Sequence, residues 1–281
     1  MKLACVIAIF GGCLAAQTDT RGIVPEAVLQ ARAQAKAATP APAPKYVPQG
    51  TPGRIARVGA KQLGVTIWRL RSATGDDRGA RILVQEESGT TTWVPERVSS
   101  TTSLRPGDML RLTFESPEQG YLYVIDRERY STGEQSTPFL IFPTTRTRGG
   151  DNRVGAGKPI DIPGQDDRPN FFTMHKSRAD QVEEEITVLL TLKPLEGVEI
   201  GPAALALPSE QVAAWEKQWK GKAEVFELAG GAGKAWTAAE QRAAADSTRL
   251  LTQEDPAPQT VYRVETGPGD PMLITVRLRY R

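Results

Sequence analysis

The segments Met109-Leu-Arg-Leu-Thr-Phe-Glu-Ser116 and Gly120-Tyr-Leu-Tyr-Val-Ile-Asp126 decide the fold class. In the first, leucine and phenylalanine alternate with arginine and threonine, which is the period-two pattern of a strand with one buried face. The second is more continuously apolar, and a polar turn separates the two. The pair therefore predicts an antiparallel hairpin inside a β core.

Other short apolar runs repeat this pattern along the chain, separated by turns rich in Gly and Pro. Further strands are expected at Leu63–Leu70, Ile82–Val84, Phe139–Phe142, Lys158–Ile162, Glu185–Lys193, Thr260–Val264 and Met272–Tyr280. Many short strands with frequent turns predict a mainly β protein, an antiparallel Ig-like β-sandwich. We assign this core domain to residues 54–199.

The pattern changes at residues 200–258, which we interpret as a small helical insertion near the C-terminus. One helix is expected from Ser209, because Val212, Trp215 and Trp219 recur at helical spacing and form a packing stripe. A capping box at Thr237-Ala-Ala-Glu240 begins a second helix. Residues 259–281 are then expected to form a C-terminal β-hairpin that returns to the core.

The N-terminus is typical of an export signal. Lys2 precedes an apolar run from Leu3 to Phe10, and small residues follow it. This run is too short to span a bilayer, so residues 1–16 are expected to be a signal peptide cleaved after Ala15 or Ala16. The alternative is a lipoprotein anchored at Cys13. The expected location is therefore extracytoplasmic, either periplasmic or secreted.

Residues 17–53 are rich in Ala and Pro. Proline at this density disfavours helix and strand interiors and is typical of an extended spacer. The segment also carries too few large apolar residues to offset the entropy of ordering it. We therefore expect a mobile linker.

Charge and cysteine content exclude several functional classes. The chain has 35 Lys and Arg against 33 Asp and Glu, so overall charge gives no attraction to nucleic acid. Its two cysteines, Cys5 and Cys13, both lie in the signal. With His175 as the single histidine, neither a His-pair zinc site nor Cys-His catalysis can be assembled in the mature chain.

No catalytic, cofactor-binding or metal-binding residues are therefore predicted. The stretch Gly230-Gly-Ala-Gly-Lys-Ala-Trp236 lacks the first glycine and the Ser or Thr of a phosphate loop, and it is interpreted as a turn. Paired acids at Asp76-Asp77, Asp166-Asp167 and Glu183–Glu185 leave a carboxylate-dependent hydrolase open as an alternative.

The polar loop 144–153 is the best candidate for a partner surface. It carries Arg146, Arg148, Asp151, Asn152 and Arg153. The arginines are suited to an anionic partner such as an envelope glycan or a protein carboxylate. The alternative is a structural loop in which Asp151 and Asn152 bond local backbone amides.

Residues 62–195 resemble the family catalogued as domain of unknown function 4384. The resemblance depends on five ordered motifs, which are Leu104-Arg-Pro-Gly-Asp108, Gly120-Tyr-Leu-Tyr-Val-Ile125, Leu140-Ile-Phe-Pro143, Gly150-Asp-Asn-Arg-Val154 and Ile160-Asp-Ile-Pro163. It implies an all-β module of unassigned activity. The expected function is an exported, non-enzymatic binding or interaction module of the bacterial cell envelope, and a structural subunit of an envelope assembly is a second alternative.

Overall fold

The computed structural model describes Arg32 and residues 59–75, 77, 79–86, 89–245 and 250–281. The described part of the protein is mainly β, with 45% of its residues in strands and 11% in helices, and the strands form two antiparallel sheets. This confirms the predicted fold class. The predicted signal peptide and, except for Arg32, the predicted linker lie outside the described residues.

The larger sheet has eight strands. They are β1 (Gly59–Ser72), β2 (Ile82–Glu86), β3 (Gly89–Val98), β4 (Met109–Glu115), β8 (Pro159–Ile162), β9 (Phe172–Thr173), β12 (Ala223–Glu227) and β13 (Thr260–Thr266). The long strand β1 holds this sheet together: its first half pairs with β13, its second half pairs with β3, and β4 pairs along the opposite edge.

The smaller sheet has six strands. They are β5 (Gly120–Tyr130), β6 (Phe139–Phe142), β7 (Arg153–Val154), β10 (Gln181–Thr191), β11 (Leu205–Ala206) and β14 (Met272–Arg279). The central strand β10 pairs with β5 on one side and with β14 on the other. The last strand thus joins a sheet of several strands, as its alternating apolar residues predict.

The main apolar core lies between the two sheets. Leu112 and Phe114 of β4 belong to the same buried cluster as Val124 of β5 and Val276 of β14. The alternating residues of each strand point away from this core, toward the two outer faces. The helices lie on those outer faces.

The predicted central hairpin is wrong. Strands β4 and β5 are consecutive in the chain, but β4 pairs with β1, β8 and β9, whereas β5 pairs with β6, β7 and β10. The chain crosses from one sheet to the other between them, so the two strands face each other across the core. Alternation identifies the buried face of a strand, but it does not identify the strand that pairs along its edge.

The predicted C-terminal hairpin is wrong for the same reason. Strand β13 pairs with β1 and β12 in the larger sheet, and β14 pairs with β10 in the smaller one. Residues 200–258 also contribute more than helices, because β12 extends the larger sheet next to β13.

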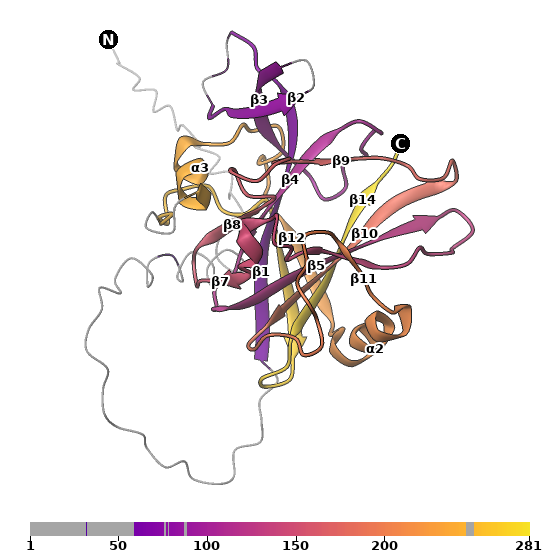
Figure 1. Cartoon of the computed structure of the whole chain (residues 1–281). Coiled ribbons are helices and arrows are strands. Elements are labelled where there is room, and N and C mark those ends of the chain that lie inside the picture. Colours follow the sequence, from indigo (N-terminus) through magenta and orange to yellow (C-terminus); the bar gives the residue numbers. More distant parts are fainter. Residues whose placement is uncertain (1–31, 33–58, 76, 78, 87–88, 246–249) are drawn as a thin grey trace, which may run out of the picture.

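Two helices cover opposite outer faces (Figure 1). The helix α2 (Ser209–Trp219) packs Val212, Trp215 and Trp219 against the smaller sheet, which confirms the predicted packing stripe. The two tryptophan rings stack 5.8 Å apart. The helix α3 (Ala238–Ala245) lies over the larger sheet near β8. The predicted capping box is present at its start, with reciprocal hydrogen bonds between Thr237 and Glu240.

Candidate functional site

The loop that follows β6 carries the predicted partner surface, and a short 3-10 helix η2 (Arg148–Gly150) forms its tip. Arg148, Gly149 and Gly150 have φ values of 54°, 64° and 86°. Left-handed backbone is uncommon for arginine, so this conformation must be fixed by its surroundings. The Arg148 amide donates a 3.0 Å hydrogen bond to Asp167 Oδ1, which ties the loop to the segment after β8.

Of the five predicted residues, Asn152, Asp151 and Arg153 bond within the protein through their side chains, whereas the side chains of Arg146 and Arg148 do not. Asn152 is buried and donates to the Leu122 carbonyl at 3.1 Å, so it holds the loop onto β5. Asp151 accepts from the Arg153 amide at 3.1 Å and from the Arg153 guanidinium at 2.8 Å. The structural interpretation is therefore correct for part of the loop, although Asn152 bonds a carbonyl of the neighbouring strand where a local amide was expected.

Three of the predicted residues, Arg148, Asp151 and Arg153, line a cleft of about 540 Å³. The rest of its lining comes from the chain around β7 and β8 and from the last residues of α3. The cleft thus lies where the loop meets the flank of the larger sheet. The polarity of the loop was visible in the sequence. The position of α3 as the opposite wall of the cleft was not, because the two segments are about 90 residues apart.

Most acids of the cleft are already bonded to the protein. Asp167 accepts from the Arg148 and Gly164 amides, and Asp151 pairs with Arg153. The Arg153 guanidinium holds the pKa of Asp151 below its usual range. Asp161 accepts from Thr113, Arg111 and Gln165. These carboxylates position loops, and this arrangement does not favour a pair of free acids for glycoside hydrolysis.

The arginines of the 144–153 loop are more accessible to a ligand than the acids of the cleft. Arg146 is exposed and Arg148 is half-buried. Within the described part of the chain, neither guanidinium makes a hydrogen bond or an ion pair. Arg153 is 72% exposed, so it can still meet a ligand while it contacts Asp151. The rim therefore offers arginine donors to an anion.

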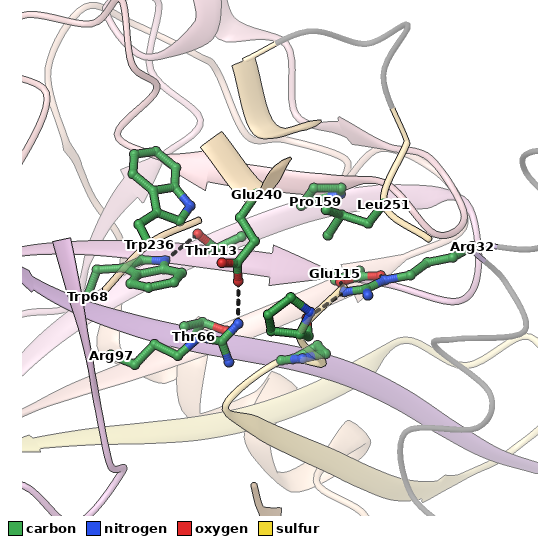
Figure 2. Close-up of a pocket in the computed structure, with 12 residues that line it drawn as sticks. Arg32, Thr66, Trp68, Arg97, Thr113, Glu115, Pro159, Trp236, Glu240 and Leu251 are labelled. Atoms are coloured by element: carbon green, nitrogen blue, oxygen red, sulfur yellow. Dashed lines mark hydrogen bonds and ion pairs between the residues drawn. The ribbon is translucent and has the colours of Figure 1, made fainter. Parts of the chain in front are cut away.

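A layer of buried polar side chains lies behind this cleft, between the outer face of the larger sheet and the segment that contains α3 (Figure 2). Arg97 pairs with Glu240, and its guanidinium lies 5.1 Å from the Trp68 ring centroid. Trp68 lies 5.8 Å from Trp236, and the Arg111 guanidinium lies 5.6 Å from the Trp236 ring. Two arginines thus flank a pair of indoles.

Hydrogen bonds connect this layer to the cleft. Trp68 donates to Thr113 at 2.7 Å, and Thr113 donates to Asp161 at 2.6 Å. The internal cavity in this layer has a volume of about 20 Å³, which is room for roughly one water molecule. The layer is therefore a packed support for the cleft wall and has no space for an organic ligand.

Away from the cleft, two acids of the smaller sheet face the core between the sheets. Asp126 and Glu184 lie on the inner faces of β5 and β10, and each has a buried carboxylate oxygen without a hydrogen-bond partner among the described residues. Burial, together with the nearby Glu184 charge, raises the pKa of Asp126 to about 7. Tyr280 and Gln181 donate to the other Glu184 oxygen.

His175 and the glycine-rich stretch 230–236 were the other segments considered for chemistry, and both have structural roles. His175 is exposed, and its carbonyl accepts from the Tyr280 hydroxyl at 2.8 Å. The glycine-rich stretch 230–236 forms the predicted turns, and its last residue, Trp236, is buried. In the described ranges, no group of three or more His, Cys, Asp or Glu side chains is placed to hold a metal ion.

In the part of the chain that the structure describes, no helix is both long enough and apolar enough to cross a bilayer. No protein-family model, curated protein or solved structure matches this chain. The resemblance to domain of unknown function 4384 therefore stays a prediction.

Proposed function

We propose that this protein is an exported, non-enzymatic binding module of the cell envelope, and that the cleft between the 144–153 loop and α3 receives its partner. The observation that carries the proposal is Arg148, which lines a cleft of about 540 Å³ and whose guanidinium makes no hydrogen bond or ion pair among the described residues. The exposed Arg146 lies two positions before it in the same loop. Export is supported by the sequence pattern of residues 1–16.

The chemistry of the rim favours a carboxylate-bearing partner. A guanidinium can present two parallel N–H groups to a carboxylate, and such charge-assisted bonds are about twice as strong as neutral ones. The left-handed backbone of Arg148 and the hydrogen bond from its amide to Asp167 fix the position of its Cα and Cβ atoms. A preorganised donor loses less conformational entropy when it binds.

The test is binding of the purified protein to two carboxylate polymers, an acidic polysaccharide such as polygalacturonate and a glutamate-rich peptide, measured by calorimetry at constant ionic strength. The double variant Arg146→Gln with Arg148→Gln should weaken binding by roughly tenfold or more, which corresponds to about 1.4 kcal/mol. Which of the two polymers binds identifies the partner as glycan or protein.

The matched control is Arg105→Gln with Arg263→Gln, which removes the same charge from exposed positions outside the cleft lining. This control should bind like the wild type. If both double variants lost affinity equally, binding would depend on overall charge alone and the cleft assignment would be wrong. Export is tested separately by N-terminal sequencing, which should begin near Ala16 or Gln17.

A further inference from the structure

The guanidinium of Arg32 lies inside the polar layer of the larger sheet, although its neighbours in sequence belong to the predicted linker. Arg32 has a helical backbone and is only 1% exposed. Its side chain lies against Glu115 at the end of β4, 83 residues further along the chain (Figure 2). At this one residue the chain is held against the sheet, whereas residues 17–53 were expected to form a mobile linker.

Every donor of this guanidinium has an acceptor. Nε and Nη2 donate to the two Glu115 oxygens at 2.5 and 2.6 Å. Nη1 donates to the Thr252 and Asp255 carbonyls at 3.1 and 3.3 Å, and Nη2 also donates to the Pro256 carbonyl at 3.3 Å. Arginine has five N–H groups in a fixed fork, and the five acceptors here match them.

The acceptors are held in place independently of Arg32. Asp255 accepts from the Thr252 amide at 2.7 Å and from its hydroxyl at 3.0 Å, which closes a turn that points backbone carbonyls at the guanidinium. Gly64 of β1 has no side chain that would collide with Pro258, so this segment can lie close to the sheet. The site is therefore built by β1, β4 and the segment 251–258.

The site also favours a cation over an uncharged occupant. Burial raises the pKa of Glu115, and Arg32 opposes that increase. A buried carboxylate without a partner is strongly unfavourable, so an empty site would be costly. An ammonium group has only three N–H donors and no planar fork, so lysine would leave acceptors unpaired.

We propose that the site formed by Glu115 and the carbonyls of Thr252, Asp255 and Pro256 is an arginine-binding site, which in this protein holds the side chain of Arg32 against the larger sheet. Its ligand class is the alkylguanidinium ion. Once Arg32 is removed, the site should accept a free alkylguanidinium from solution.

The experiment is chemical rescue of the purified Arg32→Ala protein, followed by thermal unfolding. Arg32→Ala should lower the melting temperature, and ethylguanidinium at millimolar concentrations should restore part of the loss with a saturable dependence. Ethylammonium at the same ionic strength should not. The wild type, whose site is filled, and the double variant Arg32→Ala with Glu115→Gln should show no saturable response.

A failure of ethylguanidinium to stabilise Arg32→Ala, or an equal response from the wild type, would overturn the proposal. A second measurement covers the case in which the variant does not fold. Phenylglyoxal should modify the exposed Arg105 of the wild-type protein much faster than Arg32, as measured by peptide mass mapping. Equal rates at the two arginines would show that Arg32 does not occupy the site.

Discussion

Arginine and acidic side chains meet on the outer faces of both sheets, but in different environments. Beneath α3, the pair Arg111–Asp161 has both side chains 1% exposed. On the smaller sheet, Glu183 and Glu185 of β10 lie between arginines of β5 and β14. There the arginines Arg129, Arg277 and Arg279 are 37–56% exposed, and their contacts are 3.6–3.8 Å long.

This comparison shows that burial, more than charge pairing, sets the importance of an ion pair. An exposed pair gains little because water and salt screen it and because long side chains lose entropy. A buried pair has already lost its hydration, so removal of one partner leaves the other uncompensated. The pairs beneath α3 should therefore hold that helix on the larger sheet. On the smaller sheet the pair Arg127–Glu185 is also buried, so only the pairs of Arg129, Arg277 and Arg279 should be individually replaceable.

The largest effect is expected from Arg111→Met. This change leaves the Asp161 carboxylate buried and removes the donor to the Asn170 carbonyl and the cation beside Trp236. The free energy of unfolding should fall by about 3–5 kcal/mol. Denaturant unfolding followed by tryptophan fluorescence measures this loss.

The matched control is Arg129→Met on β5, which removes one exposed arginine from a rung of the smaller sheet. It should cost less than about 1 kcal/mol. Equal losses for Arg111→Met and Arg129→Met would contradict the comparison, because burial would then have no bearing on the value of the pair.

The sequence predicted the alternation of Leu110, Leu112 and Phe114 correctly, but it could not show that the other face of β4 is also buried. Arg111 and Thr113 resemble solvent-facing residues, yet Arg111 is buried and Thr113 is half-buried. Asp161 and Asn170, and for Arg111 also Trp236, lie against them from distant parts of the chain. The capping box likewise identified Glu240, whose second partner Arg97 is 143 residues away. Contacts at such separations leave no local pattern to detect.

Among the described residues, Asp126 is a largely buried acid without an arginine side chain as its partner, and its charge should therefore depend on pH. The pKa of Asp126 in the folded protein, about 7, exceeds the ordinary value of a free Asp. Between these two values the folded state binds more protons than the unfolded state, so stability falls as pH rises from about 4 to 7. The groups that act on Asp126 are Glu184 and Glu128, which raise its pKa, and the Arg127 amide, which lowers it.

The wild type should therefore lose roughly 2 kcal/mol or more of stability between pH 5 and pH 8. Asp126→Asn should lose less, although Glu184, Glu115 and Asp161, whose pKa values burial also raises, keep part of the dependence. Melting temperatures at a series of pH values provide the measurement. An unchanged pH dependence in Asp126→Asn would assign the effect to other groups. Glu118→Gln, at a polar loop position after β4, is a control that should keep the wild-type dependence.

A smaller effect is expected from Trp215→Ala in α2, which tests the apolar part of the smaller sheet's outer face. Trp215 is half-buried and stacks on Trp219. Its loss should cost about 1–3 kcal/mol, less than full truncation of a buried tryptophan. Urea unfolding measures the change, and Lys217→Ala on the same helix, whose side chain is exposed, should be nearly neutral. An equally small effect of Trp215→Ala would show that α2 does not stabilise the sheet.

Helix α2 and the strands were predictable because periodicity and capping are local. The pairing of the strands was not, because β4 and β5, like β13 and β14, are joined by short connections that could equally close a hairpin or cross between sheets. The candidate loop was found from its polarity, but the cleft beside it depends on where α3 lies. Arg32 was missed because its acceptors come from positions 115 and 252–256.

The smallest effect is expected from Arg279→Ala at the edge strand β14. Arg279 is 56% exposed and lies 3.6 Å from Glu183, which also contacts Arg129 and Arg277. Because Glu183 keeps two other cations nearby, the variant should lose less than about 1 kcal/mol, and even that loss should shrink at high salt. Double-mutant cycles of Arg279→Ala with Glu183→Gln, measured at low and high salt, isolate the interaction from effects on the strand itself. A coupling energy as large as the Arg111→Met loss would show that the exposed rungs act as a cooperative network, and the contrast between the two faces would have to be abandoned.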